Sequence, residues 1–169
     1  MASIRGARLE EAELLAEIGL RAWEQAMIPV GETRQMLDSA RRAFRNFTHS
    51  SWITIFVVET GGATAGWAAR EGLDELITDF WIDPASEGRG LGTLLLEAIE
   101  IEMREQGHAT ARVETHARNE KAIAFFRARG YSIHWFSAAY NPRFDRDVET
   151  VGLVKQLAEL TESGYGQEF

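Results

Sequence analysis

The stretch 87–92, EGRGLG, sets three glycines at alternate positions between an apolar, strand-like segment and a leucine-rich helical one. Gly88, Gly90 and Gly92 leave the backbone bare, and Arg89 adds a cation between them. A turn of this kind gathers free N–H groups at the positive end of a helix dipole, so it is an anion-binding site with phosphate as its usual ligand. The alternative is a helix-initiating turn that binds nothing.

Two common phosphate-binding motifs do not fit these glycines. A P-loop requires Gly, four residues, Gly, Lys and Ser or Thr, and no lysine follows here, which argues against ATP and GTP. A dinucleotide fingerprint needs a third glycine at its sixth position, which is Thr93 counted from Gly88 and Leu95 counted from Gly90. The spacing therefore favours a pyrophosphate ligand without naming it.

Length and charge narrow the class of protein. The chain has 169 residues, so we expect a single domain over 1–169, with a frayed tail over 161–169. Its formal charge of −8 opposes binding to nucleic acid or to an anionic membrane, and the densest basic patch, Arg41, Arg42 and Arg45, is predicted to be the exposed face of a helix. We expect neither as a partner.

The chain has no cysteine, which excludes disulfides and thiolate zinc sites. No apolar run approaches the roughly 18 residues of a membrane span, and the first residues do not resemble a secretion signal. We therefore expect a cytoplasmic protein. The four histidines show no metal-ligand spacing, so no metal is expected; His116 alone is a minor site candidate.

Apolar periodicity predicts a mixed α/β fold of the α+β kind, with about six to seven strands and about four helices. The predicted helices span 9–27, 33–47, 91–107 and 119–129. The predicted strands span 3–7, 52–59, 63–70, 75–82, 109–116, 131–136 and 148–157, the last as the hairpin partner of the one before it.

A second motif, NEKAIAFFRARGY at 119–131, begins about 27 residues past Gly92. The segment from Ile82 to Gly92 resembles the acyl-CoA pyrophosphate motif of the GNAT N-acyltransferases, and the second motif resembles that family's second signature. The matching positions there are Asn119, Ala122, Phe125, Phe126, Gly130 and Tyr131. The order of elements also agrees with the family from Ser3 to about Leu157.

The resemblance implies a central sheet splayed between the 75–82 and 109–116 strands, with the pantetheine arm of acetyl-CoA or coenzyme A lying in the splay. The pyrophosphate would lie on the amides of the glycine turn. The cofactor-binding residues that it implies are Trp81, Ile82, Gly88, Arg89, Gly90, Leu91, Gly92, Thr93, Asn119 and Phe126.

In this family an amine attacks the acyl carbonyl directly, which requires a base for the ammonium proton. Glu114 is the leading candidate, because some family members carry a catalytic Glu before the Asn that matches Asn119, and partial burial there would raise its pKa. The alternative is a strand carboxylate that faces solvent or pairs with an arginine. Asp79 is the second candidate; strand alternation places it on the face of Trp81.

Two positions depart from the family's pattern. Glu87 replaces the usual Arg or Gln, and its carboxylate would repel a pyrophosphate unless it points away or pairs with Arg89. Phe126 occupies the aromatic pair in which some members carry a tyrosine as general acid. Protonation of the leaving thiolate would then depend on water, or on another group such as Tyr131 or Tyr140.

The acceptor side is defined by fewer residues. Trp23 and Met27 fall where the family covers its acceptor cleft, although Trp23 is also typical of a core residue, and Tyr140 leads into the other wall. We expect a small-molecule amine rather than a protein as acceptor. Pairing through 148–157 would make a homodimer. The competing readings are an acyl-CoA-binding module with little turnover and an interaction domain whose glycines are structural.

Overall fold

The computed structural model describes residues 1–141 and 146–158, so the predicted tail over 161–169 and the tip of the hairpin lie outside the described residues. The helices are α1 (Ala12–Met27), α2 (Arg34–Ser51), α3 (Leu91–Glu105) and α4 (Glu120–Ala128), with short 3-10 turns at 9–11, 52–54 and 84–86. The strands are β1 (Ala2–Gly6), β2 (Ile55–Thr60), β3 (Ala63–Ala69), β4 (Leu76–Ile77), β5 (Asp79–Ile82), β6 (Thr110–His116), β7 (Ser132–Asn141) and β8 (Arg146–Gln156). This is the mixed α/β fold that the periodicity predicts.

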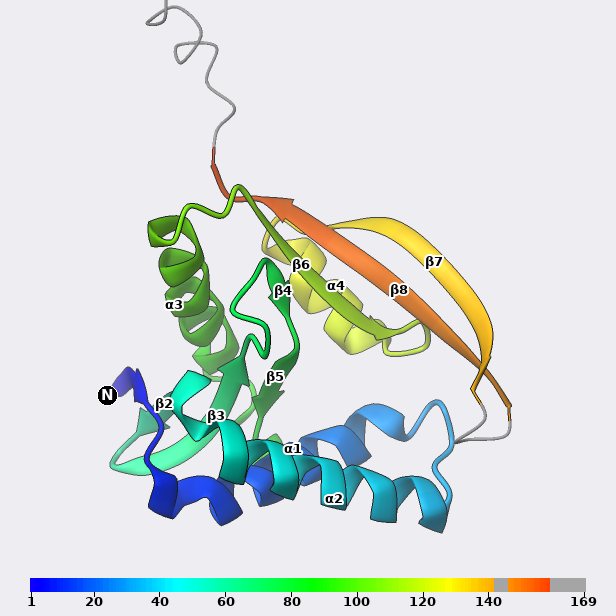
Figure 1. Ribbon diagram of the computed structural model, residues 1–169, viewed down its shortest axis with the longest axis horizontal. Helices are drawn as coiled ribbons and strands as arrows, with labels where there is room; N and C mark the ends of the chain where they lie inside the picture. The colour runs from blue at the N-terminus through cyan, green and yellow to red at the C-terminus, as the bar shows by residue number, and fades with distance from the viewer. Residues whose placement is uncertain (142–145, 159–169) are drawn as a thin grey trace, which may run out of the picture.

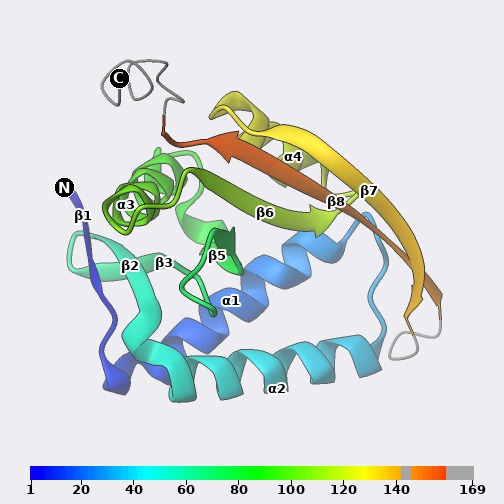
Figure 2. The ribbon, with the colours of Figure 1, turned by 45° about the horizontal axis from the view of Figure 1, so that its top comes forward.

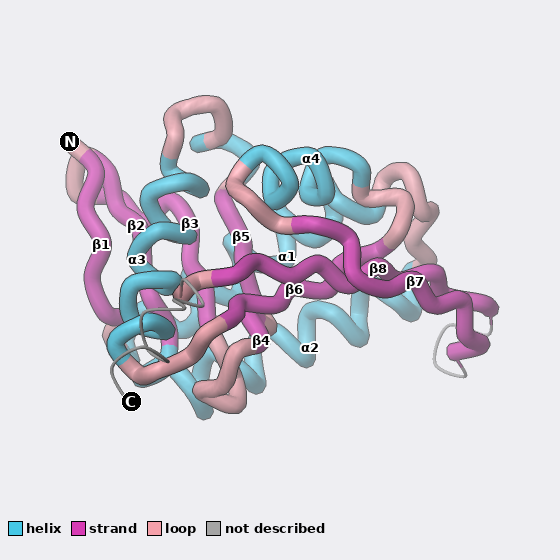
Figure 3. Tube along the Cα trace, turned by 90° about the horizontal axis from the view of Figure 1, so that it is seen from above, coloured by secondary structure: helices cyan, strands magenta, loops and turns pink. Residues whose placement is uncertain are grey.

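The strands form two four-stranded sheets, ordered β1-β2-β3-β5 and β4-β6-β8-β7 (Figure 1). All pairs of the first sheet are antiparallel, and in the second only β4 and β6 run parallel. Figure 3 shows the strands of the first sheet running across those of the second. β8 lies between β6 and β7, so the last hairpin forms the edge of the second sheet.

The segment predicted as one strand over 75–82 is divided between the two sheets. Leu76 and Ile77 pair with β6, and the carbonyl of Glu75 accepts a hydrogen bond of 2.7 Å from the N–H of Arg112. From Thr78 the backbone turns to β3 instead, with its N–H 3.0 Å from the carbonyl of Ala69. The chain therefore crosses from one sheet to the other within a single residue, and β5 diverges from β6.

Helices cover both faces of the first sheet (Figure 2). α1 and α2 pack on one face, where the indole N–H of the buried Trp67 donates to the carbonyl of Leu15 at 2.7 Å. α3 packs on the other face and, with Phe126 of α4, also covers the second sheet. Val57 and Val58 of β2 are both fully buried and face the two different clusters, so β2 is buried on both sides.

Two other boundaries differ from the sequence-based expectation. Trp52–Thr54, predicted as the start of a strand, forms a 3-10 turn that follows an α2 extended to Ser51. β7, predicted over 131–136, continues to Asn141 because β8 pairs with it along its whole length. Within the described residues, no helix is both long enough and apolar enough to cross a membrane.

Candidate functional site

The glycine turn leaves the N-terminus of α3 open. Gly88 and Gly90 have φ of 79° and 75°, in the left-handed region that favours glycine, and Gly90 occupies the N-cap position with no capping side chain. A Cβ at either residue would meet nothing within 4 Å. The first amides of α3 therefore face open space, where the helix dipole favours an anion.

Gly92 has a different role from the other two glycines. A Cβ there would lie 3.0 Å from the ring of Phe125, so Gly92 allows α3 and α4 to pack closely. The alternating pattern thus combines two conformational requirements with one packing requirement. Arg89 is exposed and is not among the residues that line the cleft described next.

A cleft of about 830 Å³ opens in front of this turn. Its walls come from the end of α1 and the loop after it, from β5, from the turn itself with the start of α3, and from α4 with the residues before it. Among the expected cofactor-binding residues, those that line it are Trp81, Ile82, Gly88, Gly90, Leu91, Gly92, Thr93, Asn119 and Phe126. The structure thus gathers two distant sequence motifs around one cavity.

The cleft is also lined by three cations that we did not predict from the sequence: Arg118, Lys121 and Arg129. Arg129 lies 3.9 Å over the ring of Phe125 and donates to Thr93 Oγ1 at 2.8 Å, which places a positive charge next to the first turn of α3. Lys121, Phe125 and Arg129 follow one another at four-residue spacing. That spacing, which marks one helix face, was the signal available in the sequence.

Glu87 forms an ion pair with Lys121 rather than with Arg89. Of the two expected alternatives, pairing with Arg89 is therefore wrong, and Glu87, which lines the cleft, is paired with Lys121 instead. The pair spans the cleft from the glycine turn to α4, and both residues line it. Lys121 is 72% exposed and Glu87 38%, so water screens the contact and either side chain can exchange partners.

Asn119 and Phe126 hold the other side of the cleft. The Asn119 side chain caps α4 by accepting from the N–H of Ala122 at 3.2 Å, and its amide donates to Thr115 Oγ1 at 3.2 Å. Both ends of the side chain are thereby oriented. Phe126 is buried and packs against Phe80 of β5 with ring centroids 5.5 Å apart. It offers the cleft an apolar surface and no hydroxyl.

Asp79 lies on the same face of β5 as Trp81, as strand alternation predicts. Its Oδ1 accepts a hydrogen bond of 3.1 Å from the indole N–H of Trp81, and Trp81 in turn packs against Phe44 of α2. Burial raises the pKa of Asp79 above its ordinary value of 3.8, against the hydrogen bonds from Trp81 and Thr78, which lower it. Asp79 is therefore a shielded carboxyl beside the splay.

Glu114 is exposed, so the expected desolvation of its carboxylate is wrong. It pairs across the sheet with Gly152 of β8, and the Cβ position of Gly152 is covered by the ring of Trp135. The neighbouring pair, Val113 and Leu153, faces the core under α3. Glu114 thus stands on the opposite face of β6, the face of His116 two residues further along.

The two tyrosines proposed as alternative acids lie away from the cleft. The hydroxyl of the buried Tyr131 donates to Glu100 of α3 at 2.6 Å, and burial together with that carboxylate raises the pKa of Tyr131 far above its ordinary value. This tyrosine holds its proton, so its proposed role as an acid is wrong. Tyr140 is 57% exposed near the end of β7 and lines neither cavity described here.

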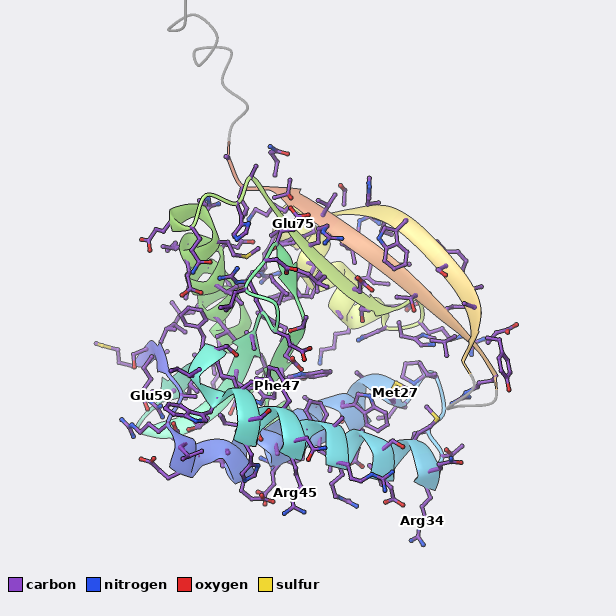
Figure 4. All side chains as sticks on the ribbon, viewed as in Figure 1. Met27, Arg34, Arg45, Phe47, Glu59 and Glu75 are labelled. Carbon is purple, nitrogen blue, oxygen red and sulfur yellow. The ribbon has the colours of Figure 1, made fainter. Side chains whose placement is uncertain are left out.

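A second, smaller cavity of about 130 Å³ lies between the α1–α2 loop and the start of β8. Met27, expected on the acceptor side, lines it and lies in Figure 4 between the helix pair and the β7–β8 hairpin. Trp23 is half-buried against the cluster between α1, α2 and the first sheet, and lines neither cavity. Among the described residues, no group of three His, Cys, Asp or Glu side chains could hold a metal ion.

The family model described as "Acetyltransferase (GNAT) family" matches residues 17–131 of this chain. No curated protein sequence matches it significantly.

Solved structures share the fold at low sequence identity. A GCN5-related N-acetyltransferase from Rhodopseudomonas palustris has a TM-score of 0.75 at 19% identity, covering 92% of this chain and 96% of its own. The PaiA N-acetyltransferase of Thermoplasma acidophilum, in complex with coenzyme A, gives 0.72 at 15% identity, with coverages of 92% and 99%. The putative acetyltransferase YncA of Salmonella typhimurium, with acetyl-CoA, gives 0.66 at 18% identity, with coverages of 95% and 96%.

Proposed function

Because the chain belongs to the GNAT acetyltransferase family, we propose that it transfers an acetyl group from acetyl-CoA to the primary amine of a small molecule. One observation carries this proposal: the uncapped N-terminus of α3 opens into a cleft that three cations, Arg118, Lys121 and Arg129, also line. Such a site suits the pyrophosphate of coenzyme A. The volume of about 830 Å³ leaves room for a long, partly apolar ligand.

The residues of the cleft fit the separate parts of this ligand. The amides of Leu91, Gly92 and Thr93 would hold the pyrophosphate, and the edge of β5 at Trp81 and Ile82 would hold the pantetheine arm along the splay. When bound, acetyl-CoA supplies an acetyl thioester; the acceptor nitrogen forms a bond to the acetyl carbon, the carbon–sulfur bond breaks, and one proton passes from the amine to the sulfur overall.

We propose Glu114 as the base for the ammonium proton. It is exposed on the face of β6 that also carries His116, whereas Asp79 is half-buried and accepts a hydrogen bond from Trp81. We expect Glu114→Gln to lower kcat/KM by about a hundredfold, as is typical for removal of a general base, with acetyl-CoA affinity unchanged. Full turnover of Glu114→Gln at pH 7 would exclude it, and a larger loss in Asp79→Asn would assign the role there.

A second candidate function is an acyl-CoA-binding module with little turnover. Phe126 favours it, because no hydroxyl stands at that position of the cleft wall and Tyr131 is held by Glu100. The sulfur would then take its proton from water alone, which permits binding and slows product formation.

The first test is calorimetric titration of acetyl-CoA into the protein, with NAD and adenosine as controls. We expect micromolar binding of acetyl-CoA alone. Thiol release with an amine panel then separates the two candidates, and since the chain has no cysteine, a thiol reagent reports coenzyme A without background. Failure to bind millimolar acetyl-CoA would overturn both.

A further inference from the structure

The small cavity adjoins the acyl-CoA cleft at two places. Arg118 lines both, and Met27 and Ile28, successive residues of the chain, line the small cavity and the large cleft respectively. A molecule seated in the small cavity would therefore lie near the Arg118 side chain that also lines the cleft. Its apolar wall comes from the α1–α2 region through Met27, Val30 and Met36.

The opposite wall is cationic where it meets this region. Arg146, at the start of β8, donates through Nη2 to the carbonyl of Gly31 at 2.6 Å and contacts Met36 Sδ at 2.8 Å, so its guanidinium lies across the cavity from β8 to the α1–α2 loop. A guanidinium presents five N–H groups in a planar fork that matches a carboxylate.

Two acidic residues, Asp147 and Glu149, also line this cavity. Strand alternation places Arg146 and Val148 on one face of β8, and Asp147 and Glu149 on the other. The pairing of Thr150 with His116 shows that the first of these faces is the one that His116 shares. Arg146 thus shares a face of the sheet with His116, while the two carboxylates come from the other face of β8 within the lining of the same cavity.

His116 adds a neutral donor to the same wall. Its Nδ1 accepts the backbone N–H of Arg118 at 3.1 Å, so the neutral ring carries its proton on Nε2. Burial, followed by the charge of Arg118, lowers the pKa of His116 below 6.5; the charge of Glu149 opposes this shift, and Arg146 adds a smaller contribution to it.

We propose that the acceptor is a small aminocarboxylate, with its carboxylate held by Arg146, Arg118 and the Nε2–H of His116 and its amine directed toward the acyl-CoA cleft. This inference rests on the proposed acetyltransferase function. The cavity of about 130 Å³ is close to the roughly 150 Å³ that accommodates a benzene-sized molecule, so it suits a head group of amino-acid size. Diamines and polyamines carry no anion that the two guanidinium groups could bind, although Asp147 and Glu149 also line the cavity.

The test compares acceptors that differ only in the anion. Thiol release is measured with acetyl-CoA and each free amino acid, its carboxamide and its decarboxylated amine, together with putrescine. For the best amino acid we expect a kcat/KM about tenfold to a hundredfold above that of its carboxamide, the range expected for losing a hydrogen-bonded charge partner.

Two variants then locate the anion site. In Arg146→Gln the preference for the amino acid over its carboxamide should fall to less than about threefold, through KM, while acetyl-CoA affinity stays unchanged because Arg146 does not line the acyl-CoA cleft. Arg146→Glu should lower amino-acid use further and raise that of putrescine. Arg42→Gln, an exposed arginine of α2 that lines neither cavity, is the matched control and should leave the preference intact.

The outcomes separate this inference from the function on which it rests. The inference is overturned if the amino acid and its carboxamide are used equally, if putrescine is preferred, or if no aminocarboxylate is acetylated. In each of these cases, binding of acetyl-CoA would still support the proposed acetyltransferase function. Absence of acetyl-CoA binding overturns both. If Arg146→Gln fails to fold, the comparison of acceptors on the unaltered protein decides by itself.

Discussion

Glu87 stands at the glycine turn with a negative charge, and it would compete with a ligand phosphate for Lys121, its ion-pair partner. Glu87→Gln removes the repulsion and frees Lys121 to approach the pyrophosphate. We expect acetyl-CoA to bind about two- to fivefold more tightly, the scale of an exposed ion pair. Calorimetry measures the change. Glu97→Gln, the same charge change on the exposed side of α3 outside the cleft, is the control; an equal gain there would show a general charge effect instead.

Asp79 and Asp83 carry pKa shifts of opposite sign within five residues of chain. Burial raises the pKa of Asp79, so the folded protein keeps a proton that the unfolded chain releases near pH 3.8. The free energy of unfolding therefore decreases as the pH rises from 3.8 through the raised pKa. Asp79→Asn keeps an acceptor for the Trp81 N–H. It should raise the free energy of unfolding at pH 7 and reduce this loss, as measured by urea denaturation across pH.

Asp83 provides the contrasting case. Its hydrogen bond with Arg21, 2.8 Å long, lowers the pKa of Asp83, so its contribution to stability is present above pH 3.8 and is lost as pH falls through the lowered pKa. Asp83→Asn should therefore lower the free energy of unfolding at pH 7 and have little effect in acid. If both variants change stability in the same direction at pH 7, the assigned causes are wrong.

At the scale of the element, α3 has a glycine with positive φ at each end, Gly90 at 75° and Gly107 at 87°, and a Cβ at either would meet open space. Alanine at either position should therefore cost a similar conformational energy, about 1 kcal/mol. Gly90→Ala should in addition weaken acetyl-CoA binding several-fold, because it disturbs the amides that would hold the pyrophosphate. Gly107→Ala, at the end of α3 that lies outside the cleft, should leave the affinity unchanged. Denaturation and calorimetry on both variants separate the effects.

The elements also show where sequence patterns stop being informative. Helix and strand types follow from periodicity because burial of one face is a local property of the sequence. The change of sheet at Thr78 is not a local property, because it depends on a distant strand. The backbone N–H of Thr78 bonds to the carbonyl of Ala69 in β3, whereas the residues just before it pair with β6. Trp52–Thr54 is apolar and β-branched like a strand, yet the end of α2 extends into it as a 3-10 turn.

The residues of the site likewise divide into those that could be predicted from the sequence and those that could not. The glycine turn and the second motif predicted most of one cleft, because each carries its chemistry within a short segment. The ion pair of Glu87 with Lys121 joins residues 34 positions apart, and the exposure of Glu114 depends on which face of β6 the helices cover. Neither can be read from spacing, because both depend on how two sheets are packed.

For the molecule as a whole, a buried polar network joins α3 to the second sheet. Glu100 of α3, 3% exposed, accepts from the hydroxyl of Tyr131 at 2.6 Å and from Lys155 of β8 at 2.9 Å. Each partner satisfies a carboxylate that would be costly to bury alone. The network lies outside the lining of the cleft, so we assign it to fixing α3 against the second sheet rather than to acting on a substrate.

Tyr131→Phe tests this separation of roles. Removing the hydroxyl takes one hydrogen bond from the buried Glu100, so the free energy of unfolding should fall by about 1.5–3 kcal/mol, as for a bond to a charged group. The turnover number should stay within about twofold of that of the unaltered protein. The reason is that the Tyr131 hydroxyl is hydrogen-bonded to Glu100, which together with burial raises its pKa and makes it a poor proton donor. A general acid would instead cost about a hundredfold or more in turnover on removal. A fall in turnover of that size in a folded Tyr131→Phe protein would return this tyrosine to the chemistry.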